Sequence, residues 1–174
     1  VSKMEKPTVL DAYAGIATFG ICVSDVAEKV TSVEENSSSI QKAKEVLKSN
    51  NIENVELFAQ DTLRYLKSIK KKFDIIILDP PRKGCTQEVL DEVLRHLKSN
   101  HSKAESDEIL CFAQNDAIAE RASKGKIIYV SCNPATLARD LKYLTEHGAK
   151  VESIQPFDMF CHTYHIENVA IINL

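Results

Sequence analysis

The 174-residue sequence lacks long apolar runs, paired cysteines and a strong excess of charge of either sign. No stretch approaches the roughly 20 apolar residues that a transmembrane helix needs, so we do not expect a membrane protein. No signal peptide is recognised, because the start is polar and leads directly into a predicted strand. Internal repeats and low-complexity segments are also absent. A start at Val1, so close to that strand, indicates one domain of a longer protein.

The five cysteines form no CxxC pair, and their number is odd. This argues against a disulfide framework and a zinc site, and it favours reduced thiols in the cytoplasm. Free cysteines are usually buried among apolar side chains, and we expect this of Cys22, Cys85, Cys111 and Cys161. Cys132 stands in a different context, which is treated below.

The formal net charge is only -3, from 22 basic and 25 acidic residues. Phosphate binding depends largely on Lys and Arg, so this balance argues weakly against a dedicated nucleic-acid clamp. It leaves room for a local basic groove, since residues 64–72 hold five basic side chains. With 44% hydrophobic and 27% charged residues, the chain is expected to bury the core of one domain.

Short apolar runs alternate with patterns typical of amphipathic helices. Strands are predicted at 8–11, 29–33, 55–59, 73–78, 126–131, 151–156 and 168–174, and helices at 17–28, 38–50, 62–71, 88–97 and 134–146. The alternation predicts an α/β fold with a doubly wound, mostly parallel seven-stranded sheet. The last two strands have no helical pattern between them, which indicates an antiparallel pair at one edge. Residues 99–125 interrupt the alternation of strands and helices. We interpret them as an insertion without an assigned role, with a possible helix at 108–122.

Ligands of doubly wound sheets bind beyond the carboxyl ends of the strands, where the distinctive residues of this chain gather. The small-residue turn 11–20 after the first strand lets a ligand approach backbone N–H groups. It lacks the full G-x-G-x-x-G spacing and would also suit a plain tight turn. Glu34, after the second strand, can accept ribose hydroxyls, although Glu35 or a solvated role is the alternative. Asp61 can accept from an adenine amine or cap the next helix, and the two roles are compatible.

The segment Asp79-Pro-Pro-Arg82-Lys83-Gly84 follows a fully apolar strand. A carboxylate in that position needs an ionic or hydrogen-bonding partner or a functional role, and the prolines stiffen the backbone around it. Arg82 and Lys83 can meet phosphate. The plainer alternative is a salt bridge between Asp79 and Arg82.

Cys132 lies in Ser131-Cys132-Asn133-Pro134, just after a predicted buried strand. The positive end of the helix that follows can lower the pKa of a thiol there, which would make it a nucleophile. The alternative is a core cysteine. Thirty-five residues further on stands Glu167, in the motif that begins at His162. His162 and His165 have no third ligand at zinc-like spacing, so we predict no metal site and assign them packing or substrate contacts.

Together these motifs resemble the RNA uracil-C5 methyltransferase family, which uses S-adenosylmethionine. The resemblance rests on Asp79-Pro-Pro-Arg-Lys-Gly-Cys85, on Val130-Ser-Cys-Asn-Pro-Ala-Thr-Leu-Ala-Arg-Asp140 and on His162-Thr-Tyr-His-Ile-Glu167. It implies a Rossmann-like catalytic domain over residues 1–174, with the family's N-terminal RNA-binding part outside this sequence. It implies Cys132 as the nucleophile and Glu167 as the general base. The cofactor-contacting positions it implies are Tyr13, Thr18, Glu34, Asp61 and Asp79.

The implied partner is RNA, and the look of the motifs around Cys132 and His162 favours rRNA over tRNA. Two alternatives remain open. The chain can be an N-methyltransferase in which Asp79-Pro-Pro holds the target amine and Cys132 is structural. It can also be a catalytically silent RNA-binding or scaffold domain, because Ala17 stands where the family usually has a second glycine, and its methyl group can crowd the cofactor.

Overall fold

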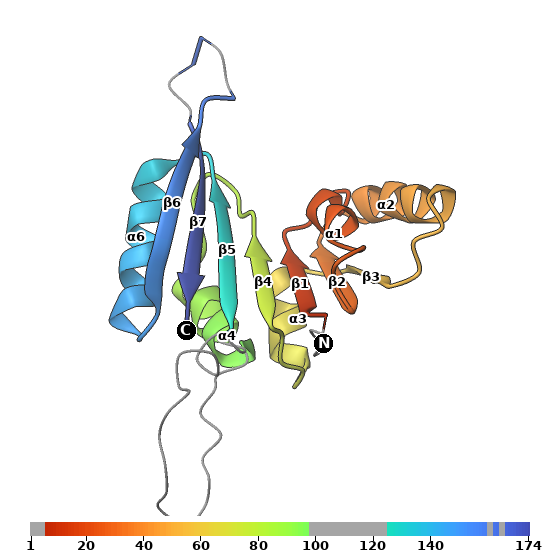
Figure 1. Cartoon of the computed structure of the whole chain (residues 1–174), viewed down its shortest axis with the longest axis horizontal. Helices are drawn as coiled ribbons and strands as arrows, with labels where there is room; N and C mark the ends of the chain where they lie inside the picture. Colours follow the sequence, from red (N-terminus) through yellow and green to blue (C-terminus); the bar gives the residue numbers. More distant parts are fainter. Residues whose placement is uncertain (1–5, 98–124, 160–161, 164–165) are drawn as a thin grey trace, which may run out of the picture.

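The computed structural model describes residues 6–97, 125–159, 162–163 and 166–174 (Figure 1). The helix expected at 108–122, together with Cys111, Cys161 and His165, lies outside the described residues. The described part forms a seven-stranded sheet with helices on both faces, as the sequence predicts.

The sheet has the strand order β3-β2-β1-β4-β5-β7-β6. The strands are β1 (Thr8–Ala12), β2 (Lys29–Glu34), β3 (Val55–Ala59), β4 (Ile75–Leu78), β5 (Lys126–Ser131), β6 (Lys150–Phe157) and β7 (Glu167–Asn173). β1 to β5 pair in parallel, whereas β7 runs antiparallel to both of its neighbours, β5 and β6. The expected antiparallel pair is therefore present, with β7 inserted between β5 and the edge strand β6.

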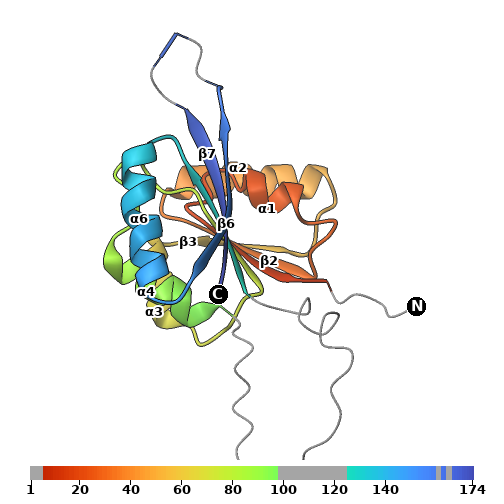
Figure 2. The ribbon, with the colours of Figure 1, turned by 60° about the vertical axis from the view of Figure 1, so that its left-hand side comes forward.

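In the described part of the chain, helices cover both faces of the sheet (Figures 1 and 2). α1 (Thr18–Cys22) and α2 (Ser37–Ser49) cover the β1–β3 half, and α3 (Thr62–Ser68), α4 (Gln87–His96) and α6 (Pro134–Glu146) cover the opposite face. None of these described helices is long and apolar enough to cross a bilayer. The first βα turn and the start of α6 both lie at the carboxyl edge of the sheet.

The helix predicted at 17–28 ends much earlier, at Cys22. The backbone N–H and the hydroxyl of Ser24 both bond to the Ile21 carbonyl, at 3.2 and 2.7 Å, and this local bonding competes with a further helical turn. Ser68 ends α3 in the same way, through a 2.7 Å bond to the Tyr65 carbonyl. Cys22, as the last residue of a short helix, is exposed, so the expectation that it is buried was wrong. Cys85 is buried as expected.

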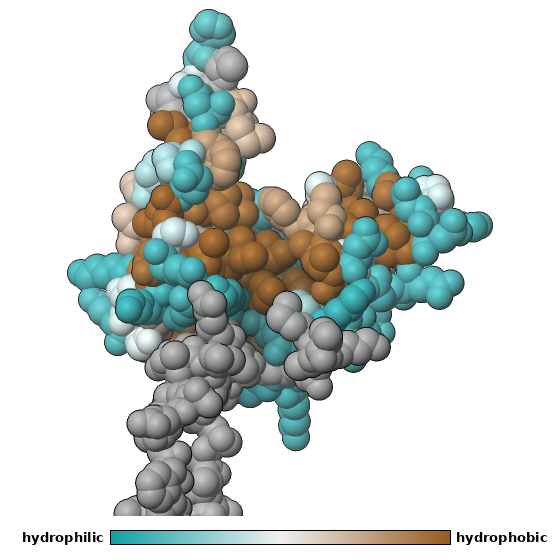
Figure 3. Space-filling model, in the orientation of Figure 1, coloured by the Kyte–Doolittle hydropathy of each residue, from teal (hydrophilic) through white to brown (hydrophobic). Residues whose placement is uncertain are grey.

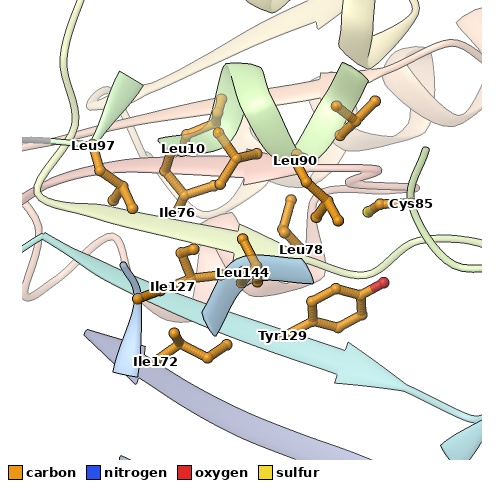
Figure 4. Packing of buried hydrophobic residues seen from close by; sticks show 14 of the residues in the cluster. Leu10, Ile76, Leu78, Cys85, Leu90, Leu97, Ile127, Tyr129, Leu144 and Ile172 are labelled. Carbon is orange, nitrogen blue, oxygen red and sulfur yellow. The ribbon is translucent and has the colours of Figure 1, made fainter. Parts of the chain in front are cut away.

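The larger core lies between the sheet and α3, α4 and α6 (Figure 4). Side chains of a strand alternate between faces, so every second residue of β4, β5 and β7 enters this core. Its members include Leu10, Ile76, Leu78, Leu90, Ile127, Tyr129, Leu144 and Ile172. A smaller cluster, with Val9, Val30 and Ile77, packs on the other face of the sheet.

On that other face, an apolar surface extends from β4 to β7 (Figure 3). Ile77, Ile128 and Ile171 are aligned across three strands by the pairing register, and Ile128 and Ile171 are partly exposed. Among the described residues, no helix lies over this part of the sheet (Figures 1 and 2). Ile127 and Ile128 therefore occupy contrasting environments on adjacent positions of one strand.

Candidate functional site

A cavity of about 420 Å³ opens at the carboxyl edge of the sheet. Its walls come from the ends of β1 and β2, the start of α3, the loop after β4 and the first turn of α4. The lining residues are Tyr13, Glu34, Glu35, Asp61, Thr62, Leu63, Asp79, Pro80, Pro81, Lys83, Gly84, Thr86 and Val89. Four of the five predicted cofactor positions are thus brought together here. The fifth, Thr18, is the exposed first residue of α1 and does not line the cavity.

Glu34 stabilises the turn that follows β1 through hydrogen bonds to the backbone. Its Oε2 accepts a 2.9 Å hydrogen bond from the Gly15 N–H, and its Oε1 accepts one of 2.8 Å from the Asn36 N–H. The carboxylate therefore has a structural task as well as a place on the cavity wall, and each oxygen keeps a lone pair for a ligand hydroxyl. Glu35 also lines the cavity, so both acids considered from the sequence reach it.

Ala17 adopts the left-handed conformation, with φ of 61°, at the N-terminus of α1. Its side chain is 0% exposed and packs in a small cluster with Ala14 and Ala43. The methyl group therefore points into the protein, and Ala17 is not part of the cavity lining. Crowding of the cavity by this methyl group, the basis of the silent-domain alternative, has no support in this arrangement.

Asp11 is a buried carboxyl group beneath the same turn, and sequence reasoning assigned it no role of its own. Its Oδ2 accepts 2.9 Å and 3.1 Å hydrogen bonds from the Gly20 N–H and the Ser32 hydroxyl. A Cβ on Gly20 would lie 2.4 Å from that hydroxyl oxygen, so only glycine fits this close approach. Burial raises the pKa of Asp11 to about 6. The signal in the sequence was an acid inside an otherwise apolar strand.

Asp61 fills both roles that the sequence left open. Its Oδ1 accepts a 2.9 Å hydrogen bond from the Arg64 N–H, which caps α3, while the residue also lines the cavity. Asp79 makes no ion pair with Arg82 among the described residues, so the salt-bridge interpretation is wrong. Asp79 is accessible but stands in a concave site, and desolvation there raises its pKa.

Cys132 and Glu167 directly flank the last residue pair of the β5–β7 ladder. Ser131 pairs with Asn168 at the end of this antiparallel ladder, so the next step of the register sets Cys132 opposite Glu167. The Asn168 side-chain amide also donates to the Ser131 carbonyl at 3.3 Å. Cys132 is partly exposed, and burial followed by repulsion from Asp79 raises the pKa of Glu167. Neither residue lines the 420 Å³ cavity, and Asp79 is the residue that links the two regions.

His162 is exposed and has a φ of 64°. In the described part of the chain, no three His, Cys, Asp or Glu side chains gather as a metal site would require. The site consists of a polar cavity walled by carboxylates, with a thiol and a carboxylate beside it. Such a set can bind a hydroxyl- and amine-rich ligand, and it can add a thiolate to a substrate from which a base removes a proton.

Two family models match the sequence. Residues 1–132, about three quarters of the chain, match the model described as conserved hypothetical protein 95. Residues 115–173 match the model of tRNA (uracil-5-)-methyltransferase, and this range contains both Cys132 and Glu167.

Curated relatives include RNA methyltransferases of uncharacterised function. One from Thermotoga maritima is 38% identical over 94% of this chain and 31% of its own length. One from Gloeobacter violaceus is 35% identical over 95% of this chain and 30% of its own length. The chain thus spans about a third of the length of these relatives.

Among solved structures, the Pyrococcus abyssi tRNA (uracil-54, C5)-methyltransferase in complex with S-adenosyl-L-homocysteine is 30% identical. The match has a TM-score of 0.68 and covers 98% of this chain and 34% of that one. A putative methyltransferase from Streptococcus mutans, at 16% identity and a TM-score of 0.73, shares the fold. That match covers 98% of this chain and 45% of the other.

Proposed function

The chain belongs to the conserved hypothetical protein 95 family and is related to the RNA uracil-C5 methyltransferases, and on this premise we propose that it methylates uracil C5 in RNA. The observation that carries the proposal is the β5–β7 register, which sets Cys132 opposite Glu167 at the same sheet edge as the carboxylate-walled cavity. We also propose that residues 1–174 are the catalytic domain of a longer cytoplasmic protein.

S-adenosylmethionine fits the donor set of the cavity. Glu34 offers carboxylate oxygens for ribose hydroxyls, and Asp61 offers one for an exocyclic amine, while Tyr13 and Asp79 add further polar groups to the wall. Its volume of about 420 Å³ lies in the usual range of about 300–1,000 Å³ for small-molecule sites. When bound, this cofactor supplies an electrophilic methyl group on a sulfonium. Thr18 is the one expected contact outside the cavity, and we propose no binding role for it.

Cys132 performs the first chemical step in this proposal. Its thiolate adds to C6 of the uracil, and the electron pair of the C5–C6 bond moves toward O4, which makes C5 nucleophilic. C5 then attacks the methyl carbon of the sulfonium, and the methyl–sulfur bond breaks with its electron pair left on the sulfur, so that S-adenosylhomocysteine would be released. Glu167 removes the proton from C5, and the electron pair of that C–H bond restores the C5–C6 double bond and expels the Cys132 thiolate. A positioned base of this kind contributes about 10²–10⁴-fold to a rate.

The environment of Glu167 supports the role of a base. Partial burial and the nearby Asp79 raise its pKa, which strengthens it as a proton acceptor while leaving it ionisable. The target uracil has to be single-stranded or flipped out to reach such a site.

The RNA class is part of the proposal. The sequence motifs favour rRNA, whereas the matched family model and the P. abyssi structure are named for tRNA. Incubation of the full-length protein with labelled cofactor and each RNA class, followed by nucleoside mass spectrometry, tests the function. We expect 5-methyluridine. A methyl group on an exocyclic or protein nitrogen would instead favour the N-methyltransferase alternative.

A further inference from the structure

The helix that follows Cys132 holds the loop that walls the cofactor cavity. Five hydrogen bonds join α6 or its cap to the segment Arg82–Cys85. The Asn133 amide and the Thr136 hydroxyl donate to the Arg82 carbonyl, at 3.2 and 3.1 Å. The guanidinium of Arg139 donates to the carbonyls of Lys83 and Cys85, at 2.9 and 3.0 Å. The Cys85 N–H donates to Asp140 at 2.8 Å.

Asp140 is the buried centre of this contact. Its side chain is 1% exposed, yet its two oxygens accept from the Cys85 N–H, from the Tyr129 hydroxyl at 2.6 Å and from Arg139 Nε at 2.8 Å. These three donors, one of them charged, satisfy the buried oxygens of the carboxylate. Arg139 and Asp140 together hold the loop at residues 82–85, and we call these two residues the bracket.

Gly84 lets the loop approach the bracket closely. Its φ is 75°, and a Cβ there would lie 2.5 Å from Asp140 Oδ2 and 2.6 Å from a terminal nitrogen of Arg139. A side chain at this position would force the loop away from α6. Gly84 and Lys83 also line the 420 Å³ cavity, so displacement of the loop would move the cavity wall.

The contact also extends from Asp140 to another residue of the cavity wall. The Cys85 thiol interacts with both Tyr129 and Tyr13, and Tyr13 lines the cavity. Burial raises the pKa of Cys85 to about 12, so this thiol stays protonated and serves packing rather than nucleophilic chemistry. A continuous series of side-chain contacts therefore connects the helix after Cys132 to the cavity, from Asp140 through Tyr129 and Cys85 to Tyr13.

We propose that Arg139 and Asp140 are positioning residues that fix the Cys132 region relative to the cofactor cavity. This inference rests on the proposed methyl transfer. The uracil is held by Cys132 while its C5 receives the methyl group, so the two regions have to stay aligned within about 0.5 Å. A misplacement of about 1 Å costs about 10²-fold in rate. Neither residue has to touch substrate or cofactor for this effect.

The test separates the transfer rate from binding. In Arg139→Ala and Asp140→Asn, we expect the single-turnover rate constant of methyl transfer to fall about 10- to 100-fold. The affinities for S-adenosylhomocysteine and RNA are expected to stay within about threefold, because the groups that contact each ligand remain. Arg139→Lys keeps the charge and one donor, and it should recover part of the rate. All rates are measured at a temperature where circular dichroism shows the variant to be folded.

Tyr143→Phe is the matched control on the same helix. It removes the 2.7 Å hydrogen bond from Tyr143 to Asp91 on α4 and leaves the loop contacts intact, so its rate should equal that of the wild type. If the bracket variants do not fold, Thr136→Val removes one loop bond at a partly exposed position and should slow transfer by about threefold or more. Folded variants with wild-type rate constants would overturn the inference. The variants are made in the full-length protein, and a full-length wild type that transfers no methyl group would overturn the proposed function instead.

Discussion

The ionisation of the buried Asp11 affects the stability of the first βα turn. Its Oδ1 has no hydrogen-bond partner among the described residues, while Oδ2 holds Gly20 and Ser32. The charges of Asp79 and Glu34 act on it in the same direction as burial, which is the larger cause of its raised pKa. A charged Asp11 is therefore disfavoured in the folded state.

The pH dependence of folding should report this residue. The folded pKa of about 6 exceeds the ordinary value of 3.8, so the folded state binds the proton more tightly. The stability contributed by the proton is complete below pH 3.8 and is lost as the pH rises through 6, by about 3 kcal/mol in total. The unfolding free energy of Asp11→Asn, measured with urea between pH 4 and 7, should lack this contribution to its slope against pH. A slope identical to that of the wild type would contradict the assignment.

Glu167 leads to a second pH prediction, now for activity. A general base has to be ionised, so the transfer rate should fall as the pH drops through its pKa, which lies above the ordinary range of a glutamate. Asp79→Asn removes the like charge and should move this acidic limb to lower pH, even where the overall rate is reduced. The measurement is the single-turnover rate against pH, with Asp91→Asn as the control. An unmoved limb would argue that Asp79 does not act on the base.

At the level of elements, the sequence predicted all the strands and helices of the described residues, because their apolar periods are clear. It misjudged helix ends at Ser24 and Ser68, where a hydroxyl takes a carbonyl that the next turn needs. It indicated Cys132 as a possible nucleophile from its place between a strand and a helix, whereas the role of Glu167 as a base came from the family resemblance. Their juxtaposition depends on the β5–β7 register, which pairs residues 37 positions apart and leaves no local pattern. The Arg139–Asp140 bracket was missed for the same reason.

The two faces of β5 yield a matched stability test. Ile127 is 1% exposed in the larger core, whereas Ile128 is partly exposed and packs against the smaller cluster on the other face of the sheet. Ile127→Ala should cost about 2–5 kcal/mol of unfolding free energy, and Ile128→Ala clearly less, since less contact is lost. Urea denaturation at one pH compares them. Equal losses would mean that the second face of the sheet is covered as fully as the first.

At the scale of the whole molecule, the sheet brings two half-sites to one edge. The parallel half, β1 to β4, builds the carboxylate-walled cavity, and the antiparallel insertion of β7 beside β5 brings Glu167 to the side of Cys132. The Asp79–Gly84 loop spans the two, and α6 holds it through hydrogen bonds. Because the loop joins the two regions, the motif after β4, Asp79–Gly84, and the motif after β5, around Cys132, belong to a single site.

The covalent intermediate is the most direct test of this arrangement. RNA carrying 5-fluorouridine cannot release a proton from C5, so the adduct with the thiol should persist. With S-adenosylmethionine present, we predict a complex stable to denaturing electrophoresis, with the methylated nucleotide attached to Cys132 by mass spectrometry. Cys132→Ala should abolish it, whereas Cys22→Ala, which changes another accessible cysteine, should not. A complex that survives in Cys132→Ala would contradict the assigned nucleophile.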